Sequence, residues 1–579
     1  MFVAILFTCI GVLHAEPFTI INEFPGGTEA SFTVHADHAI HGWQVRLVFD
    51  RPIYQLKIWV ADIVSHTPTE WVVRNKDFDL DVSPGNDVTV EFQYFYSGDQ
   101  VPHGTYTIQG FELTGYGTTF ASNTAYSYLS ATASSMRYNY SEALGLSILF
   151  YDAQRSGKLP TDNPIPWRGD SALSDADIGH DLSGGWYDAG KHIKYNFPMA
   201  FSTWVLEWGM LKFADGYSTA GQVNMACDMI RWPLEYFLKS WIPEKNILYV
   251  QVGDPDFEDI YWGRAENMNM SRPAYKVTQS CKGSDVAGDT VSAFAAGYLV
   301  FKHMCSDAVF ADKLLTAAKS LYTFTVNNRG RYTDCLTKTK TAYGSSFEND
   351  EVALAAVWMY KATRDNTYLS YARGHYPGGT SWTFSWDDVN PAVALLLYEE
   401  TRHSVYKRDI ESFIRDFLPG GKRYYTPCGL VWVAEWGTSR YAANVALIAL
   451  MAAEEGIQPD TYKKWALSQI NYILGDNKLH ISYMIGFGNA FPLHPHHKGS
   501  ACPTNVDWCF ENASGPNPNI LYGGLVGGPD RKDNYSDKRE DEKQNSATCD
   551  GNAAFQSALA GLIHLAVRGS LPRAPDSRC

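Results

Sequence analysis

The chain has 579 residues, of which 45% are hydrophobic and 14% are aromatic, and its formal net charge is −15 at pH 7. This length exceeds one small domain and the apolar content can fill large cores, so we expect two domains, one of them large. The acidic balance, with no block rich in lysine and arginine, argues against a nucleic-acid partner and favours a neutral ligand.

Residues 1–15 have the pattern of a secretory signal peptide. An apolar run from Phe2 to Leu13 leads into the small-residue end Leu13-His14-Ala15, although no positive residue precedes the run. The run is too short to span a membrane, and no later stretch approaches about 20 uninterrupted apolar residues. We therefore expect a secreted, extracellular protein with no membrane partner. Four N-x-Ser triplets agree with export, at Asn139, Asn269, Asn512 and Asn534.

Nine of the ten cysteines follow this predicted leader. An odd number in an exported protein leaves at least one thiol unpaired or paired between chains, and the terminal Cys579 is our candidate. The disulfide pairing and the oligomeric state do not follow from the sequence.

Residues 16–121 predict a small β-sandwich. Short runs alternate apolar and polar residues, as in residues 43–49 and 87–94, and glycine-containing turns separate them. Residues 122–136, rich in Ser, Thr and Ala, predict a linker.

Residues 137–570 predict a large all-α domain, followed by a tail at 571–579. Apolar runs recur with helical spacing, and several are apolar nearly all round, which indicates helices buried on more than one side. The loops between them are too long for plain connections in a compact bundle, so we expect them to carry functional residues. Four of these loops, at residues 184–197, 433–444, 482–503 and 527–553, combine aromatic, acidic and basic residues, which suits a cleft for neutral sugars.

Several motifs of this domain resemble family 9 glycoside hydrolases, which are cellulases acting on β-1,4-glucan, and most of all their animal-type branch. The motifs are Gly184-Gly185-Trp186-Tyr187-Asp188-Ala189-Gly190, Gly283-Ser284-Asp285-Val286-Ala287, Phe384-Ser385-Trp386-Asp387-Asp388, Trp436-Gly437-Thr438-Ser439-Arg440-Tyr441, Tyr472-Ile473-Leu474-Gly475-Asp476-Asn477 and Gly527-Gly528-Pro529-Asp530. The resemblance runs in order along residues 137–567. It implies an (α/α)6 barrel with a cleft across one end, an inverting mechanism and no required cofactor.

An inverting glycosidase needs two carboxyl groups, one as the base that activates water and one as the acid that protonates the leaving oxygen. The resemblance implies that the water-holding acid is Asp188, that the base position is occupied by Lys191, and that the acid position is occupied by Ser546. We expect Lys191 to pair with Asp188 and to lower its basicity. Since Glu540, Asp541 and Glu542 lie several residues upstream of the acid position, we do not expect them to replace the acid.

Other cleft positions divide into changed and retained residues. Compared with the family pattern, a histidine has become Asp259, a tyrosine has become Gly551, an aromatic residue has become Glu542, and an arginine has become Lys498, which loses the two-pronged donor. The resemblance assigns catalytic positions also to Asp537 and His496. It assigns substrate-binding positions to Trp262, Trp436, Arg440, Tyr441, Lys498 and Arg539.

A calcium site is a further implication of the resemblance. The positions that hold calcium in relatives are occupied here by Ser346, Asp350, Glu351 and Asp387, whose oxygen atoms suit a hard cation. The alternative, which stays open, is a helix start with Asp350 and Glu351 in its first turn.

The N-terminal module resembles family 2 carbohydrate-binding modules more weakly. Trp59 and Phe78 fall at positions where such modules place flat sugar-binding rings, and Trp71 is a third candidate. A core role for any of the three stays open, because alternation does not reveal which face of the sheet is outward.

We therefore expect a secreted cellulase-family protein that binds β-1,4-glucan or a related neutral polysaccharide, with hydrolysis lost or severely reduced. One alternative is an active inverting endo-β-1,4-glucanase that uses Asp188 and an unrecognised acid. The other is an extracellular matrix or interaction protein built on the same scaffold.

Overall fold

The computed structural model describes residues 16–24, 27–35, 40–58, 61–75, 81–82, 87–96, 100–112, 136–379, 381–506, 509–575 and 577–579. The chain divides into two compact units, Met1–Ala121 and Ser122–Cys579. The predicted signal peptide, nearly all of the predicted linker, Trp59 and Phe78 lie outside the described residues.

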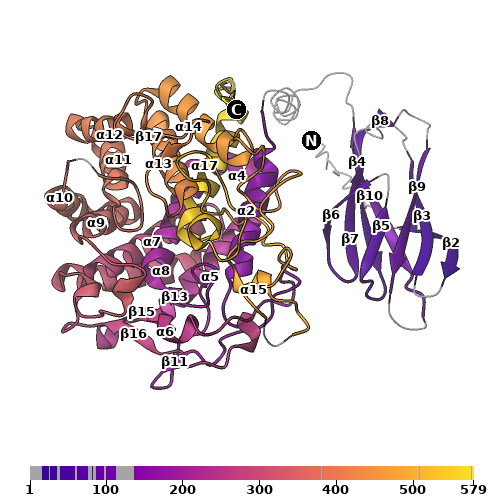
Figure 1. The fold of residues 1–579 in the computed structure, drawn as a ribbon, viewed down its shortest axis with the longest axis horizontal. Helices are drawn as coiled ribbons and strands as arrows, with labels where there is room; N and C mark the ends of the chain where they lie inside the picture. The colour runs from indigo at the N-terminus through magenta and orange to yellow at the C-terminus, as the bar shows by residue number, and fades with distance from the viewer. Residues whose placement is uncertain are drawn as a thin grey trace, which may run out of the picture. The chain divides into compact units, whose positions relative to one another are not determined.

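The first unit contains two antiparallel sheets (Figure 1). One has the strand order β1-β10-β4-β7-β6, with β8 paired to β4, and the other has the order β2-β3-β9-β5. The strands are β1 (Glu16–Pro17), β2 (Thr19–Phe24), β3 (Gly27–His35), β4 (Ile40–Phe49), β5 (Gln55–Ile58), β6 (Ala61–His66), β7 (Glu70–Asn75), β8 (Asp81–Val82), β9 (Asp87–Phe95) and β10 (Gly104–Glu112).

Alternation along these strands places their apolar side chains in one core. On β4, Val45, Leu47 and Phe49 are buried, while Arg46 between them is exposed. Trp71 is 4% exposed and belongs to the same core, so it does not form a sugar-binding surface. Core packing explains why this indole is retained on a central strand.

The second unit is a double ring of helices. Six inner helices pack side by side in a closed ring, in the order α3, α7, α9, α11, α13 and α17, and each has an outer partner, respectively α5, α8, α10, α12, α14 and α2. This is the expected (α/α)6 barrel. The inner helices are α3 (Asn196–Lys212), α7 (Ser284–His303), α9 (Asn349–Thr363), α11 (Asn390–Thr401), α13 (Thr438–Glu454) and α17 (Cys549–Val567). The outer helices are α2 (Tyr140–Gln154), α5 (Val223–Ser240), α8 (Ala308–Asn327), α10 (Asn366–His375), α12 (Ser404–Phe417) and α14 (Pro459–Leu474).

Sequence periodicity separates the inner helices from the outer ones. All of α17 from Cys549 to Ala566 is buried, so no face of this helix meets solvent, and most of its residues are apolar. In α12 the buried residues are Tyr406, Ile410, Phe413, Ile414, Asp416 and Phe417, a one-sided stripe at helical spacing. The apolar runs without a polar face therefore mark the inner ring.

Shorter elements fill the connections of this unit. The helices are α4 (Ala214–Thr219), α6 (Pro255–Glu258), α15 (Lys498–Ala501) and α16 (Glu542–Asn545). The strands are β11 (Ala176–Asp177), β12 (His180–Asp181), β13 (Lys194–Tyr195), β14 (Trp241–Ile242), β15 (Ile247–Val252), β16 (Ala274–Val277), β17 (Tyr424–Tyr425) and β18 (Val431–Trp432).

Four disulfides crosslink the described part of the second unit: Cys227–Cys305, Cys281–Cys335, Cys428–Cys579 and Cys502–Cys509. The first ties α5 to the end of α7, and the third ties the tail to the loop before β18. The expectation that Cys579 is unpaired was wrong. Among the described cysteines the free one is Cys549, which is buried at the start of α17. Packing inside the inner ring, rather than position at the end of the chain, isolates this thiol.

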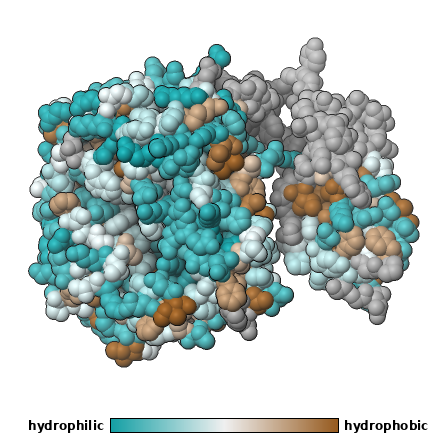
Figure 2. Space-filling view, viewed as in Figure 1, coloured by the Kyte–Doolittle hydropathy of each residue, from teal (hydrophilic) through white to brown (hydrophobic). Residues whose placement is uncertain are grey.

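The visible face of the second unit is largely hydrophilic, with separate small hydrophobic patches (Figure 2). Among the described helices, none is both long and apolar enough to cross a bilayer.

Candidate active-site cleft

Loops from distant parts of the chain converge on one cleft of about 500 Å³. The segments that lead into α3, α9, α11, α13 and α17 all contribute to it, so these inner helices begin at the same end of the barrel. The lining residues are Asp188, Ala189, Gly190, Lys191, Ile193, Tyr195, Pro255, Asp259, Thr341, Ala342, Tyr343, Trp386, Trp436, Arg440, His496, Glu542, Ser546 and Thr548.

Asp188 lies in a tight turn at the base of the cleft. Its backbone N–H donates to the carbonyl of Ile193 at 3.0 Å, and its carbonyl accepts from the N–H of Cys549 at 2.8 Å. These bonds fix the turn against the start of α17. Oδ2 accepts a hydrogen bond from the Tyr343 hydroxyl at 2.5 Å, whereas Oδ1 is buried without a hydrogen-bond partner among the described residues.

The surroundings of Asp188 favour its protonated form. Burial and the neighbouring Asp550 carboxylate raise the pKa of Asp188 to about 7, while the Tyr343 hydrogen bond and Arg440 act in the opposite direction. At pH 5 only about one Asp188 in a hundred is therefore ionised.

Lys191 points to a different carboxylate from the one we expected. Its Nζ lies 2.7 Å from Oδ1 of Asp259 and 3.7 Å from Oε1 of Glu542. Burial lowers the pKa of Lys191, but these two contacts outweigh burial, and the pKa is raised. The expected ion pair between Lys191 and Asp188 was wrong, because Asp259 and Glu542 attract the ammonium to the opposite side of the turn.

Ser546 and Glu542 both line the cleft. A single helical turn, α16, separates them, and the N–H of Ser546 donates to the carbonyl of Glu542 at 3.0 Å. Side chains four residues apart on a helix share one face. Glu542 therefore lies one helical turn from the acid position, in the same cleft. That Glu542 does not replace the acid stays a prediction.

His496 presents an unpaired ring nitrogen beside this pair. Its Nδ1 lies 2.9 Å from the carbonyl of Arg539, which makes Nδ1 the protonated nitrogen of a neutral ring. Burial lowers the pKa of His496 despite the nearby Glu542. Nε2 is buried, has no hydrogen-bond partner among the described residues, and lies 3.8 Å from Oε1 of Glu542. The lone pair of Nε2 is therefore free to accept a hydrogen bond.

The opposite wall carries Trp436 and Arg440. The Trp436 side chain is 44% exposed, so a ring face is available to a ligand. Arg440, in the first turn of α13, contacts the fully buried Asp550 at 2.9 Å through Nη1 and donates to the Tyr441 hydroxyl at 3.2 Å through Nη2. This pair anchors α13 to α17 at the base of the cleft.

A family model described as Glycosyl hydrolase family 9 matches residues 140–559. The chain belongs to this family. It is 41% identical to Endoglucanase A of Bacillus pumilus over 458 residues, which cover 76% of this chain and 68% of that protein. The matched residues lie within the second unit, so the resemblance of the first unit to a carbohydrate-binding module stays a prediction.

Solved structures agree with this membership. The endoglucanase of the termite Nasutitermes takasagoensis is 42% identical, with a TM-score of 0.71 over 74% of this chain and 100% of that one. The cellulase Cel9M of C. cellulolyticium, solved in complex with cellobiose, is 33% identical, with a TM-score of 0.68 over 74% of this chain and 98% of that one.

Besides Lys498, four of the predicted catalytic and substrate-binding residues lie outside the residues that line the cleft of this family 9 domain. Asp537 accepts from the N–H groups of Leu493 and His494 at 2.9 and 3.0 Å. Arg539 donates to Asn517 and to loop carbonyls. Both shape the loop that carries His496. The other two are Tyr441, behind Arg440, and Trp262, whose ring lies 5.2 Å from that of His496.

Lys498 is buried rather than presented to the cleft. Its Nζ contacts Oε1 of Glu258 at 2.9 Å and donates to the carbonyls of Glu258 and Tyr261. The ammonium thus ties the start of α15 to the end of α6 and to the loop that follows α6. A substrate-binding role for Lys498 would require these bonds to break.

Three of the predicted calcium ligands hydrogen-bond within the chain, whereas both carboxylate oxygens of Glu351 and Oδ1 of Asp350 are buried without a hydrogen-bond partner among the described residues. The Ser346 hydroxyl donates to Asp387 at 2.7 Å, and Asp350 accepts from the N–H of Val389 at 3.0 Å. Within the part of the chain that the structure describes, no group of three or more His, Cys, Asp or Glu side chains is placed to hold a metal ion. The calcium site stays a prediction.

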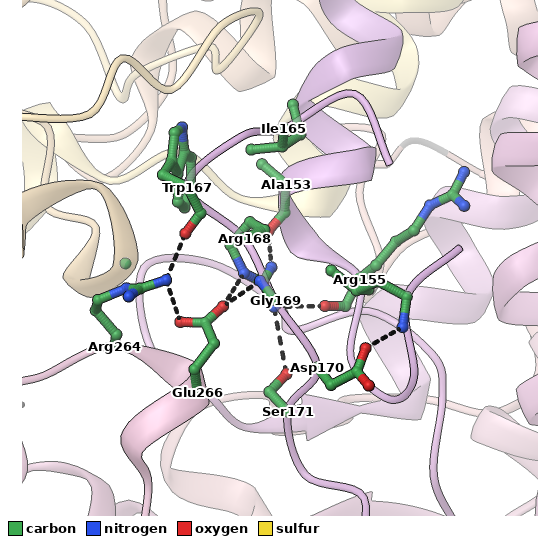
Figure 3. A network of polar contacts seen from close by, with 12 residues as sticks. Ala153, Arg155, Ile165, Trp167, Arg168, Gly169, Asp170, Ser171, Arg264 and Glu266 are labelled. Atoms are coloured by element: carbon green, nitrogen blue, oxygen red, sulfur yellow. Dashed lines mark hydrogen bonds and ion pairs between the residues drawn. The ribbon is translucent and has the colours of Figure 1, made fainter. Parts of the chain in front are cut away.

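A buried polar network supports the wall behind the histidines (Figure 3). Arg168 and Arg264 contact Glu266 from either side, at 2.9 and 3.1 Å. Arg264 also donates to the carbonyl of Trp167 at 2.6 Å, and the Trp167 ring packs at 5.9 Å against that of His497. These contacts hold the segment that carries His496 and His497 against the loop that follows α2.

Proposed function

We propose that the protein is secreted and binds β-1,4-glucan in this cleft, with hydrolysis lost or severely reduced. The observation that carries the proposal is that Lys191 and Ser546 line one cleft with Asp188. The resemblance assigns the first two to the family's base and acid positions. The aromatic and polar lining and the cellobiose complex of Cel9M support the ligand.

The chemistry of these groups opposes an inverting hydrolysis. A general base must accept a proton from water, and Lys191 already carries one, with its pKa raised. A serine hydroxyl does not donate a proton to a departing sugar oxygen at a useful rate. Since each missing group typically costs about two to four orders of magnitude, hydrolysis by this pair falls to nearly nothing.

Purified protein incubated with carboxymethyl-cellulose and amorphous cellulose tests this proposal, with reducing sugar and pull-down scored together. We expect pull-down without release of reducing sugar. Trp436→Ala should weaken pull-down, whereas Trp382→Ala, a matched change at a ring of 45% exposure outside the lining residues, should not. Hydrolysis at a rate typical of relatives would contradict the loss of activity, and the absence of both signals would favour a matrix or interaction role.

A second candidate is an active inverting endoglucanase, which the position of Glu542 favours. In that mechanism one carboxylate removes a proton from water as the water oxygen bonds to the anomeric carbon. The other carboxyl donates its proton to the departing glycosidic oxygen. In such enzymes the two carboxyl groups lie roughly 6.5–9.5 Å apart. If Asp188 and Glu542 form this pair, Glu542→Gln abolishes the hydrolysis, while the exposed neighbour Glu540→Gln leaves it unchanged.

A further inference from the structure

One wall of the cleft is rich in hydrogen-bond acceptors and carries more negative than positive charge. Among the described residues, Lys191 is the one ammonium in contact with either Asp259 or Glu542, and it lies 2.7 Å from the first and 3.7 Å from the second. The side chain of Asp259 is 59% exposed and that of Glu542 is 37% exposed. Two carboxylates therefore share a single cation, and each keeps an oxygen for a ligand.

A further acceptor extends this wall. His496 is 3% exposed, and its unpartnered Nε2 carries a lone pair 3.8 Å from Glu542. No donor among the described residues reaches this nitrogen, so it points to a donor supplied by a ligand.

Two other acidic groups close to this wall are paired with cations. Glu258 contacts Lys498 at 2.9 Å and His192 at 3.2 Å, and Asp550 contacts Arg440 at 2.9 Å. Glu511, whose Oε1 lies 3.5 Å from Nδ1 of His496, adds a further carboxylate to this region. Of the carboxylates without a cation of their own, Asp259 and Glu542 line the cavity.

We propose that the cleft prefers a β-1,4-linked glycan that carries primary amino groups, such as a chain of 2-amino-2-deoxyglucose. This proposal rests on the proposed function and names the ligand class of the same cleft. Such a chain has the rings and linkage of β-1,4-glucan, with one hydroxyl of each sugar replaced by an amine. An ammonium has three donors and no acceptor, so it fits a wall of acceptors better than a hydroxyl does. The ammonium of Lys191, bound between the same two carboxylates, shows that the wall accommodates this group.

Calorimetric titration of the full-length protein with three pentasaccharides tests the preference. The ligands are the β-1,4-linked pentamers of glucose, of glucosamine and of N-acetylglucosamine, at about pH 6 and low salt, where the attraction between an ammonium and the carboxylates is least screened. We expect the glucosamine pentamer to bind about 10-fold more tightly than the glucose pentamer. Added salt should narrow this gap, and the N-acetylated pentamer, whose amine is blocked, should show no gain. Mass spectrometry of each ligand after titration confirms that it is intact.

Two variants assign the preference to the wall. Glu542→Gln should reduce the advantage of the glucosamine pentamer by about threefold or more, whereas Glu540→Gln, a matched change at an exposed neighbour outside the lining residues, should leave it unchanged. Equal or weaker binding of the glucosamine pentamer, with the glucose pentamer still bound, overturns the preference alone. Failure of all three pentamers to bind overturns the proposed function as well.

Discussion

Asp188→Asn should stabilise the protein above neutral pH, because it removes a carboxylate that folding holds in an unfavourable place. Burial and Asp550 raise the pKa of Asp188 from 3.8 to about 7. The folded chain therefore retains a proton at this site that the unfolded chain releases. The free energy of unfolding must fall as the pH rises between these two values, and it stays low above the higher one.

The size of the effect follows from the shift. About three pKa units at 1.36 kcal/mol each amount to about 4 kcal/mol above pH 7, and to almost nothing near pH 4. Asparagine has nearly the same shape and can still accept the hydrogen bond from Tyr343, so little packing is lost. For a unit of this size, about 4 kcal/mol corresponds to a rise in Tm of about 4 °C.

Differential scanning calorimetry of both proteins at one scan rate, from pH 5 to pH 8.5, measures the prediction. The Tm difference should grow with pH and level off above neutrality. Asp162→Asn, at an exposed position outside the cleft, controls for the loss of one carboxylate from the chain. A Tm difference that does not change with pH, or a wild-type protein that is the more stable of the two at pH 8, would refute the reasoning.

Three further outcomes are expected. Arg440→Met leaves Asp550 buried without its cation and should lower the free energy of unfolding, measured by denaturant titration, by about 3–5 kcal/mol. Asp550→Asn in the same chain should restore most of this loss. An unchanged midpoint would contradict the burial of the pair. Lys191→Asp combined with Ser546→Glu should raise hydrolysis of carboxymethyl-cellulose at least about 100-fold over the unmodified protein, and no rise would show that other cleft changes also block the chemistry. Cys549 should resist alkylation in the folded protein, since burial raises the pKa of its thiol. After unfolding without reductant, it should be the one cysteine of the second unit that is labelled. A second labelled peptide in mass spectrometry would contradict the disulfide pattern.

The local pattern of the sequence predicted both fold classes. The alternation around Val45 and Leu47 on β4 reflects one buried sheet face, and the runs that lack a polar face, such as α17, reflect helices surrounded on all sides. These patterns depend on which residues are buried, and burial follows from residue type. The pairing of Cys428 with Cys579 was beyond reach, because it depends on where two distant segments meet.

The site divides in the same way. The motifs around Asp188, Trp436 and Ser546 were enough to predict that these residues share one cleft, since their order along the chain matches a known family. The partner of Lys191 was decided by the tertiary structure alone. An ammonium on a long flexible side chain pairs with whichever carboxylates the neighbouring loops bring nearest. Here these are Asp259, 68 residues along the chain, and Glu542 from the C-terminal loop. The sequence thus predicted which loops form the cleft, while only the folded chain decided which of their side chains line it and how their charges pair.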